Sequence, residues 1–218
     1  TPVDASKGDL KKQIASVIKP LASMYHFQSM GEYKAVLSLY NINVEELTGE
    51  AKGKPYRGLL YSAMDSEGNK VSNPLKSSIF GKSVGYDGLE KRMAKSAERI
   101  KSKNLKAHTL KAVSEAKQSC PSENEFRAKL RQQGIDVLFR RNDEGRIYGA
   151  TFIDHTTRTV LNGSRLGKDY SANVFNDLFG GKQEPIQESA QETRLSDVYK
   201  KPEQLNFENS HSSDSGLG

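Results

Sequence analysis

The stretch SENEFRAKLRQQGIDV, residues 122–137, decides the fold because an earlier part of the chain repeats it. Residues 29–44, SMGEYKAVLSLYNINV, match it at a constant offset of 93, with six of sixteen positions identical and three more conservative. Both copies place a glutamate three residues after a serine. This spacing is typical of a helix start, where the serine oxygen accepts from an exposed amide and the glutamate reaches back. Internal repetition predicts an architecture of two related units.

The match continues beyond these segments. Gly58-Leu59-Leu60-Tyr61 corresponds to Gly149-Ala150-Thr151-Phe152, and Val71 to Val160. It ends where Ser78, Gly81 and Lys82 correspond to Ser164, Gly167 and Lys168. Each unit is therefore expected to run helix, strand, hairpin, loop, helix.

In the second unit, Ile135, Val137 and Phe139 alternate as in a half-buried strand. Turns are predicted at residues 142–145 and 155–158, with strands at 147–153 and 159–161 between and after them. Residues 65–69 hold the corresponding hairpin of the first unit. The predicted fold class is α+β, with two small units, each a short antiparallel sheet with flanking helices, joined by a basic helical segment.

Two further helices frame these units. Leu10, Ile14, Val17, Ile18 and Leu21 follow helical spacing, Asp4, Ser6 and Asp9 are possible caps, and Pro20 marks the expected end. The closing helix is expected to bury four residues: Val174, Phe175, Leu178 and Phe179. The predicted domains are 1–88 (first helix and first unit), 89–118 (basic helical connector), 119–180 (second unit) and 181–218, a disordered tail rich in Gln, Glu, Ser and Asn.

The composition favours a reducing, cytoplasmic setting and a polyanionic partner. Of 218 residues 28% are charged, and Cys120 stands alone, which excludes a disulfide framework. No apolar run approaches the roughly 20 residues that a membrane span needs. The chain begins at Thr1 without an initiator Met, so we expect a piece of a longer protein. Residues 182–218 carry 4 basic and 7 acidic side chains, so the net charge of +6 becomes +9 over residues 1–181.

The basic charge is concentrated between the two units. Residues 89–117 contain nine Lys or Arg and three Glu. An apolar stripe of Leu89, Met93, Ala97 and Ile100 predicts one buried helix face. The remaining faces are either a solvated surface or a surface for nucleic acid.

A second cationic feature is the loop Asn162-Gly163-Ser164-Arg165-Leu166-Gly167-Lys168, which precedes the last helix. Exposed amides and a helix N-terminus there favour an anion such as a phosphate, although a loop that merely turns the chain has the same composition. Residues 77–82, SSIFGK, repeat the device. Tyr148, Phe152 and Tyr170 could stack on bases, or pack in the core. The predicted DNA-binding residues are Arg140, Arg141, Arg146, Arg158, Ser164, Arg165, Lys168, Lys76, Ser78, Lys82, Lys91, Arg92, Lys95 and Arg99.

Signs of catalysis are weak in this sequence. The four histidines are scattered, and with one cysteine they predict no transition-metal cluster. Asp154-His155 could form an acid–base pair, but polar residues are common at such a turn. A Walker phosphate loop and a serine nucleophile elbow are missing. We therefore expect no enzymatic activity, no metal and no cofactor.

Several stretches resemble one family. These are FQSMGEY (27–33), LSLYN (37–41), GIDV (134–137), GRIYG (145–149) and, most specifically, FIDHTTRTVLNGSRLGK (152–168). Together they resemble the relaxase or mobilization nuclease family of bacterial conjugative and mobilisable elements. The resemblance covers nearly all of residues 1–180.

The resemblance implies a role in DNA transfer. Members of this family nick one strand at an origin of transfer, attach to it through a tyrosine and pilot it into a recipient. Their nuclease domain is N-terminal and carries a His-x-His metal cluster, which this sequence lacks. The resemblance thus implies the portion that follows the nuclease, and it assigns no catalytic residue here. The expected partners are origin-of-transfer DNA, single-stranded or hairpin, and relaxosome accessory or coupling proteins. A protein-interaction module that docks the relaxase to those proteins is the alternative function.

Overall fold

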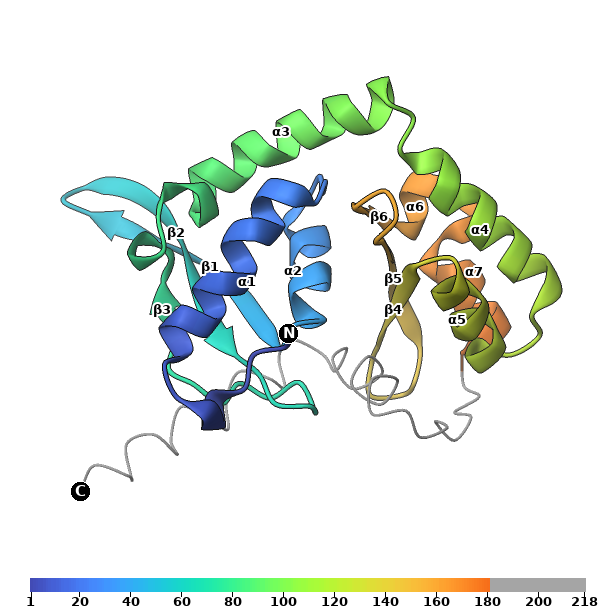
Figure 1. Cartoon of the computed structure of the whole chain (residues 1–218), viewed down its shortest axis with the longest axis horizontal. Helices are drawn as coiled ribbons and strands as arrows, with labels where there is room; N and C mark the ends of the chain where they lie inside the picture. Colours follow the sequence, from blue (N-terminus) through green and yellow to red (C-terminus); the bar gives the residue numbers. More distant parts are fainter. Residues whose placement is uncertain (181–218) are drawn as a thin grey trace.

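A computed structural model describes residues 1–180, and the predicted tail at 181–218 lies outside the described residues. The fold is α+β, with two separate three-stranded antiparallel sheets flanked by helices, as the sequence predicted (Figure 1). Within residues 1–180, no helix is both long and apolar enough to cross a bilayer.

The two units contain the same elements in the same order. Unit 1 comprises α2 (Met30–Ser38), β1 (Ile42–Ala51), β2 (Lys54–Ala63), β3 (Leu75–Lys76), η2 (Ser77–Ile79), η3 (Lys82–Val84) and α3 (Tyr86–Ser102). Unit 2 comprises α5 (Glu123–Gln132), β4 (Ile135–Arg141), β5 (Ile147–Asp154), β6 (Thr159–Asn162), α6 (Gly163–Leu166), η4 (Lys168–Tyr170) and α7 (Ala172–Phe179). Outside them lie η1 (Ala5–Lys7), α1 (Leu10–Met24) and α4 (Lys106–Ser119).

The sheet registers define which residues correspond. Val44 pairs with Tyr61 in unit 1, as Val137 pairs with Phe152 in unit 2. On the next strand Leu75 pairs with Tyr61 and Leu161 pairs with Phe152. Leu75 is therefore the counterpart of Leu161, and the predicted match of Val71 with Val160 is wrong. The loop between β2 and β3 is longer than the turn between β5 and β6, so no constant offset holds across it.

The predicted turn at 142–145 is confirmed. Asn142 Oδ1 accepts from the amides of Glu144 and Arg146, at 3.0 and 2.9 Å. Residues 65–69 also turn the chain, but between β2 and β3, so they correspond to the turn at 155–158. The β1–β2 hairpin turns instead at Lys52-Gly53, where both φ angles are positive. That turn was not predicted from the sequence.

Helix α2 is shared between the two sheets. It lies between them in Figure 1, and Leu138, Ile153 and Val160 of unit 2 belong to the same apolar core as Tyr33 and its neighbours in unit 1. A second core of unit 2 lies on the other side of its sheet, under α5 and α7. Strand β4 therefore buries residues on both faces, and the prediction of a half-buried strand is wrong. Alternation describes only one face, because the other meets α2.

Tertiary burial also shifts several predicted helix features. Helix α1 begins after its cap Asp9, but it continues past Pro20 to Met24, because Leu21 and Ala22 are buried there. Helix α3 buries Leu89, Ser96 and Ile100, whereas Ala97 is exposed. Helix α7 buries Phe175 and Phe179, whereas Leu178 is 40% exposed.

Both predicted helix caps form. Ser29 Oγ accepts from the Glu32 amide, and Ser122 Oγ accepts from the Glu125 amide, each at 3.2 Å. The Glu32 carboxylate also accepts from the Gln28 amide at 2.9 Å, from the Asn162 amide at 2.8 Å and from Arg165 Nε at 2.7 Å. Glu32 is completely buried, so this carboxylate fastens the start of α2 to unit 2.

Candidate nucleic-acid interface

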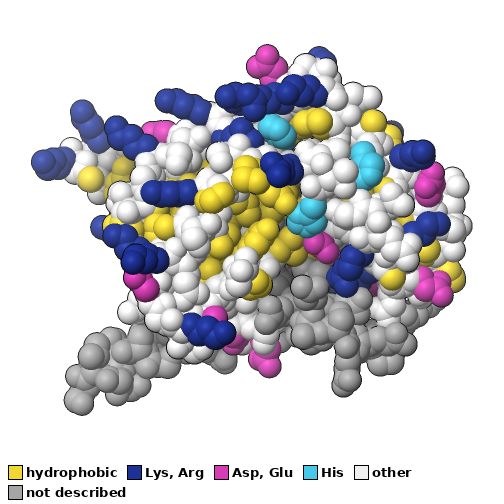
Figure 2. All heavy atoms as spheres, in the orientation of Figure 1, with side chains coloured by type: hydrophobic (Ala, Val, Ile, Leu, Met, Phe, Trp, Pro, Cys, Tyr) yellow, Lys and Arg dark blue, Asp and Glu magenta, His cyan; other side chains and the backbone are white. Residues whose placement is uncertain are grey.

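Most cations of α3 share one flank of the helix. Lys91, Lys95, Arg99 and Lys103, the residue directly after α3, follow one another at steps of four, and Arg92 points to the same flank, between the directions of Arg99 and Lys103. Side chains at such spacing share one flank of a helix. Of the acidic residues of α3, Glu90 lies on the opposite side of the helix, whereas Asp87 is one turn before Lys91 and Glu98 is three residues after Lys95, so these two lie at the edge of the same flank. We call the five cations the α3 stripe. Figure 2 shows Lys and Arg side chains gathered along the edge of the molecule that α3 forms in Figure 1.

The stripe creates a strongly positive field at His26. Burial, and then Arg92, Arg99, Lys103 and Lys95 in that order, lower the pKa of His26 to about 4. Four of the five stripe residues therefore lie close enough to act on one imidazole. Arg92 is held in place, since its Nε and Nη2 donate to the Tyr25 carbonyl at 3.0 and 2.7 Å. Its own pKa is lowered by burial and by Arg99.

Arg158 lies beside the stripe, through His26. The His26 amide donates to the Arg158 carbonyl at 2.8 Å, and the Val160 amide donates to the His26 carbonyl at 2.9 Å. This pairing adds the segment around His26 to the edge of β6. Arg158 is exposed at the turn, with φ at 54°. The structure thus brings Arg158 to the same region as Lys95 and Arg99, although they are distant in sequence.

A chain of polar contacts adjoins this region. Tyr25 Oη lies 2.6 Å from His155 Nδ1, and His155 Nε2 lies 2.8 Å from Asp136 Oδ2. The order hydroxyl, imidazole, carboxylate is that of an activated nucleophile. However, burial and the neighbouring Tyr40 raise the pKa of Tyr25 to about 12, which disfavours the phenolate. The arrangement therefore suits Tyr25 as a donor that positions His155.

Asp154 and His155 do not form the pair that their adjacency suggests. Asp154 is completely buried and accepts from Thr109 Oγ1 at 2.8 Å, and from the amides of Thr156 and Thr157. Its Oδ2 also lies 2.6 Å from His108 Nδ1. These bonds fix the β5–β6 turn against α4, so Asp154 is part of the framework.

Arg165 is engaged at the contact between the units. Its Nε lies 2.7 Å from Glu32 Oε2, and its side chain is 33% exposed. The exposed remainder faces a groove of about 540 Å³, in which Lys101 and Lys106 are the other cations. Arg165 thus has a structural partner, and it is not gathered with the α3 stripe.

The two glycine-lysine segments share the conformation of their glycine, but they differ before it, since residues Gly163–Leu166 of the predicted loop at 162–168 form the short helix α6 and Ser77–Ile79 form a 3₁₀ helix. Gly81 and Gly167 have φ angles of 117° and 136°, in the region that favours glycine. Lys82 and Lys168 follow them, each at the start of a three-residue 3₁₀ helix, and both are exposed. Lys76, Ser78 and Ser164 are exposed as well.

The remaining predicted residues lie in mixed settings. Arg141 bonds to Glu123 and is largely buried, and Arg146 donates to Asn173 Oδ1 at 3.1 Å. Among the aromatic candidates, Phe152 is completely buried, whereas Tyr148 is 41% exposed. Tyr170 lies under the Lys117 ammonium, 5.3 Å from the ring centroid. Only Tyr148 of these three presents much of its ring to solvent.

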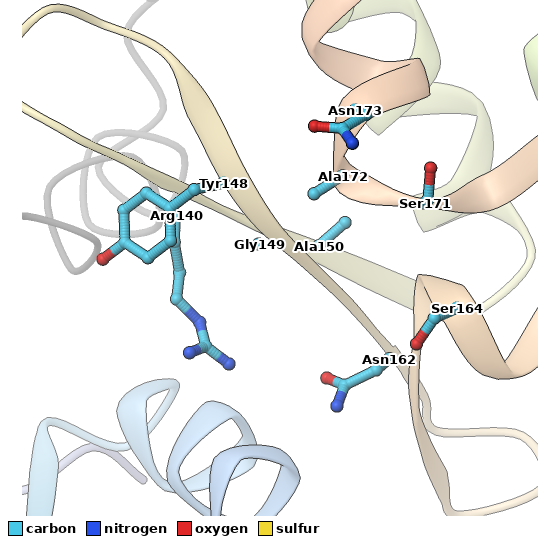
Figure 3. A pocket seen from close by; sticks show the side chains of 9 residues that line it. All are labelled: Arg140, Tyr148, Gly149, Ala150, Asn162, Ser164, Ser171, Ala172 and Asn173. Atoms are coloured by element: carbon cyan, nitrogen blue, oxygen red, sulfur yellow. The ribbon is translucent and has the colours of Figure 1, made fainter.

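Arg140, Tyr148 and Ser164 come together at a cavity of about 380 Å³ between the second sheet and the starts of α6 and α7 (Figure 3). We call it the unit 2 pocket. Its nine lining residues include none with a carboxylate: Arg140, Tyr148, Gly149, Ala150, Asn162, Ser164, Ser171, Ala172 and Asn173.

The polar partners of these sites are not among the residues predicted from the sequence. Tyr25 and His26 adjoin the stripe, Lys101 and Lys106 line the Arg165 groove, and Asn162, Ser171 and Asn173 line the unit 2 pocket. No motif marks the first four. Continuing the repeat from Lys168 into α7 would have placed Ala172 opposite Tyr86 and indicated the pocket.

Among residues 1–180, no three His, Cys, Asp or Glu side chains are arranged to hold a metal ion. Comparison with known proteins gives no identification, since no family model, no curated protein and no solved structure matches the chain.

Proposed function

We propose that this chain binds nucleic acid through the α3 stripe and is a non-catalytic, cytoplasmic, DNA-binding portion of a conjugative relaxase. The stripe carries the DNA-binding part of the proposal. The assignment to a relaxase rests on the resemblance of residues 27–41 and 134–168 described above.

The observation that supports binding is the row of cations along one flank of α3. Five cations share one flank, and four of them act together with burial to lower the pKa of His26 to about 4. A row of cations with steps of about 6 Å along a helix suits a phosphate backbone, which is recognised without regard to sequence. The backbone of Arg158, an exposed arginine of unit 2, pairs with His26 beside this row.

A salt titration tests the proposal. The full chain is titrated with a fluorescent oligonucleotide from the origin of transfer, single-stranded or hairpin, at several salt concentrations. If each of Lys91, Lys95 and Arg99 contacts one phosphate, changing all three to Gln lowers the slope of log K against log salt by about 2 to 3.

The matched control changes Lys7, Lys11 and Lys12 to Gln. These three lysines are exposed, in η1 and at the start of α1, far along the helix from Tyr25. Their substitution removes the same total charge as the α3 triple variant. Equal losses in both triple variants would indicate a net-charge effect and reject the stripe. Absence of binding by the wild-type chain would reject the function, and a pull-down of relaxosome proteins that survives nuclease treatment would then favour the protein-interaction alternative.

A further inference from the structure

The repeat gives the unit 2 pocket an internal comparison. The registers pair Gly58 with Leu47 and Gly149 with Arg140, so Leu47 corresponds to Arg140. Arg57 and Tyr148 directly precede these two glycines and correspond to each other. Past the third strand, Tyr86 begins α3 and Ala172 begins α7, each two residues after a three-residue 3₁₀ helix.

In unit 1 the chain fills this place with its own side chains. The guanidinium of Arg57 stacks on the Tyr86 ring, 5.2 Å from the centroid, and donates to its hydroxyl. Leu59, the counterpart of Ala150, is buried nearby on the same sheet. Unit 1 therefore has a cation on an aromatic ring where unit 2 has its pocket.

In unit 2 two of these side chains are replaced by methyl groups. Ala150 and Ala172 stand where unit 1 has Leu59 and Tyr86, and the cavity of about 380 Å³ lies over them. That volume is within the range of about 300 to 1,000 Å³ that small-molecule pockets occupy. The unit 2 pocket thus lies at the position that side chains of the protein fill in unit 1.

The groups around the pocket are mainly donors. Asn162 Oδ1 accepts from Thr151 Oγ1 at 2.7 Å, and Asn173 Oδ1 accepts from Arg146 Nη2 at 3.1 Å. With their oxygens engaged by the protein, both asparagines have their amide NH₂ groups to offer to a ligand. Ser164 and Ser171 add hydroxyls, and Arg140 adds a positive charge.

The aromatic component is Tyr148. Figure 3 shows its ring beside the Arg140 side chain on one wall, with Asn162, Ser164, Ser171 and Asn173 around the rest of the pocket. Arg140 lies across Gly149, whose absent side chain makes room for it, since a Cβ there would be 3.1 Å from Arg140 Cδ. An aromatic face, a cation and several amide or hydroxyl donors are the groups that bind a base and its phosphate.

We propose that the unit 2 pocket binds one nucleotide, with the base stacked on Tyr148 and the phosphate directed to Arg140 and Ser164. This inference rests on the proposed function, because it assigns the pocket to one nucleotide of the strand that the α3 stripe holds. It also predicts binding of a mononucleotide, which the stripe does not require.

The test is an NMR titration of the full chain with deoxyadenosine 5′-monophosphate, with deoxyadenosine and inorganic phosphate as separate probes. The nucleotide is expected to shift the signals of Tyr148 and Asn173, and each half-probe to bind more weakly. Ala172→Tyr restores the unit 1 side chain and is expected to weaken nucleotide binding at least about tenfold, as is Tyr148→Ala. Tyr56→Ala is the matched control, since Tyr56 is an exposed tyrosine of unit 1 (43%, against 41% for Tyr148), and it should leave binding unchanged.

Three outcomes would each reject nucleotide binding at the pocket. They are the absence of nucleotide-dependent shifts in the wild type, wild-type nucleotide affinity in a folded Ala172→Tyr variant, and a loss of nucleotide affinity in Tyr56→Ala as large as that in Tyr148→Ala. If Ala172→Tyr fails to fold, Tyr148→Ala gives the same decision.

Two further comparisons separate this inference from the proposed function. The α3 triple variant should lose oligonucleotide binding but keep mononucleotide binding. If the chain binds the mononucleotide but not the oligonucleotide, the pocket proposal holds and the proposed function is rejected. If it binds the oligonucleotide but not the mononucleotide, only the pocket proposal is rejected. A short single strand can be used to displace the bound mononucleotide. If it does so at a lower concentration than free mononucleotide does, the ligand of the pocket is a nucleotide of the strand, whereas equal effective concentrations identify a free nucleotide.

Discussion

The two units share a plan of elements and differ in what surrounds it. The same serine-capped helix starts both, yet Glu32 is completely buried while its counterpart Glu125 is exposed. The hydroxyls of Tyr33 and Tyr61 in unit 1 form a hydrogen bond of 2.8 Å, whereas their counterparts Phe126 and Phe152 lie in a cluster of phenylalanines. The difference arises because α2 lies between two sheets and α5 covers one. The positions that the two units share thus determine the order of helices and strands, and the positions that differ determine how the units pack against each other.

Removing the buried carboxylate should have the largest effect on stability. Glu32→Ala is expected to lower the free energy of unfolding by about 3 to 5 kcal/mol, because Arg165 and the Asn162 amide lose their acceptor at a buried contact. Glu125→Ala should change it by no more than about 0.5 kcal/mol, as at other exposed positions. Urea denaturation of both variants measures the difference. Similar losses would show that the glutamate acts only within its own cap.

Exchanging the aromatic pairs should have the next largest effect. Phe126→Tyr places a hydroxyl among Phe139, Phe175 and Phe179, and it is expected to cost about 2 to 3 kcal/mol. The reverse exchange, Tyr33→Phe, removes one hydrogen bond and should cost about 1 kcal/mol, since Tyr61 Oη still donates to the Val84 carbonyl at 2.7 Å. Thermal unfolding of the two variants ranks them. A cost for Tyr33→Phe as large as that for Phe126→Tyr would mean that the hydroxyl pair is central to unit 1.

The cationic loop of unit 2 divides into a structural and an exposed residue. Arg165→Ala should lower stability by about 1 to 2 kcal/mol, less than Glu32→Ala, because Arg165 is partly exposed and leaves the carboxylate its other donors. Lys168→Ala should change stability by less than about 0.5 kcal/mol and should weaken oligonucleotide binding slightly. Denaturation and salt titration of each variant separate the two roles. If Lys168→Ala destabilises as much as Arg165→Ala, the loop is structural throughout.

Much of the fold was accessible from the repeat, whereas the sites were less so. The serine caps and the 142–145 turn depend on local rules, and both were predicted correctly. The short helix α6 within the predicted loop at 162–168 was not predicted. The continuation of α1 past Pro20 and the burial of Leu138 depend on tertiary contacts that no local pattern reports. The partner of Arg165 is 133 positions away in sequence, so its ion pair with Glu32 could not be inferred from the loop. The pocket was within reach of the repeat, through Tyr86 and Ala172.

The smallest expected effect is a change in the pKa of His26, which reports on the stripe without altering the fold. In the native chain burial and the α3 cations hold this pKa at about 4, below the ordinary value of 6.5, so the native imidazole is neutral at pH 7. A phosphate backbone on the stripe offsets the positive field, and the pKa should rise by a fraction of a unit, while the contribution of burial stays. NMR titration of His26 with and without oligonucleotide measures this. Lys95→Gln with Arg99→Gln should raise the pKa in the absence of DNA and reduce the further rise on adding it. An unchanged His26 pKa under saturating oligonucleotide would place the nucleic acid elsewhere on the chain.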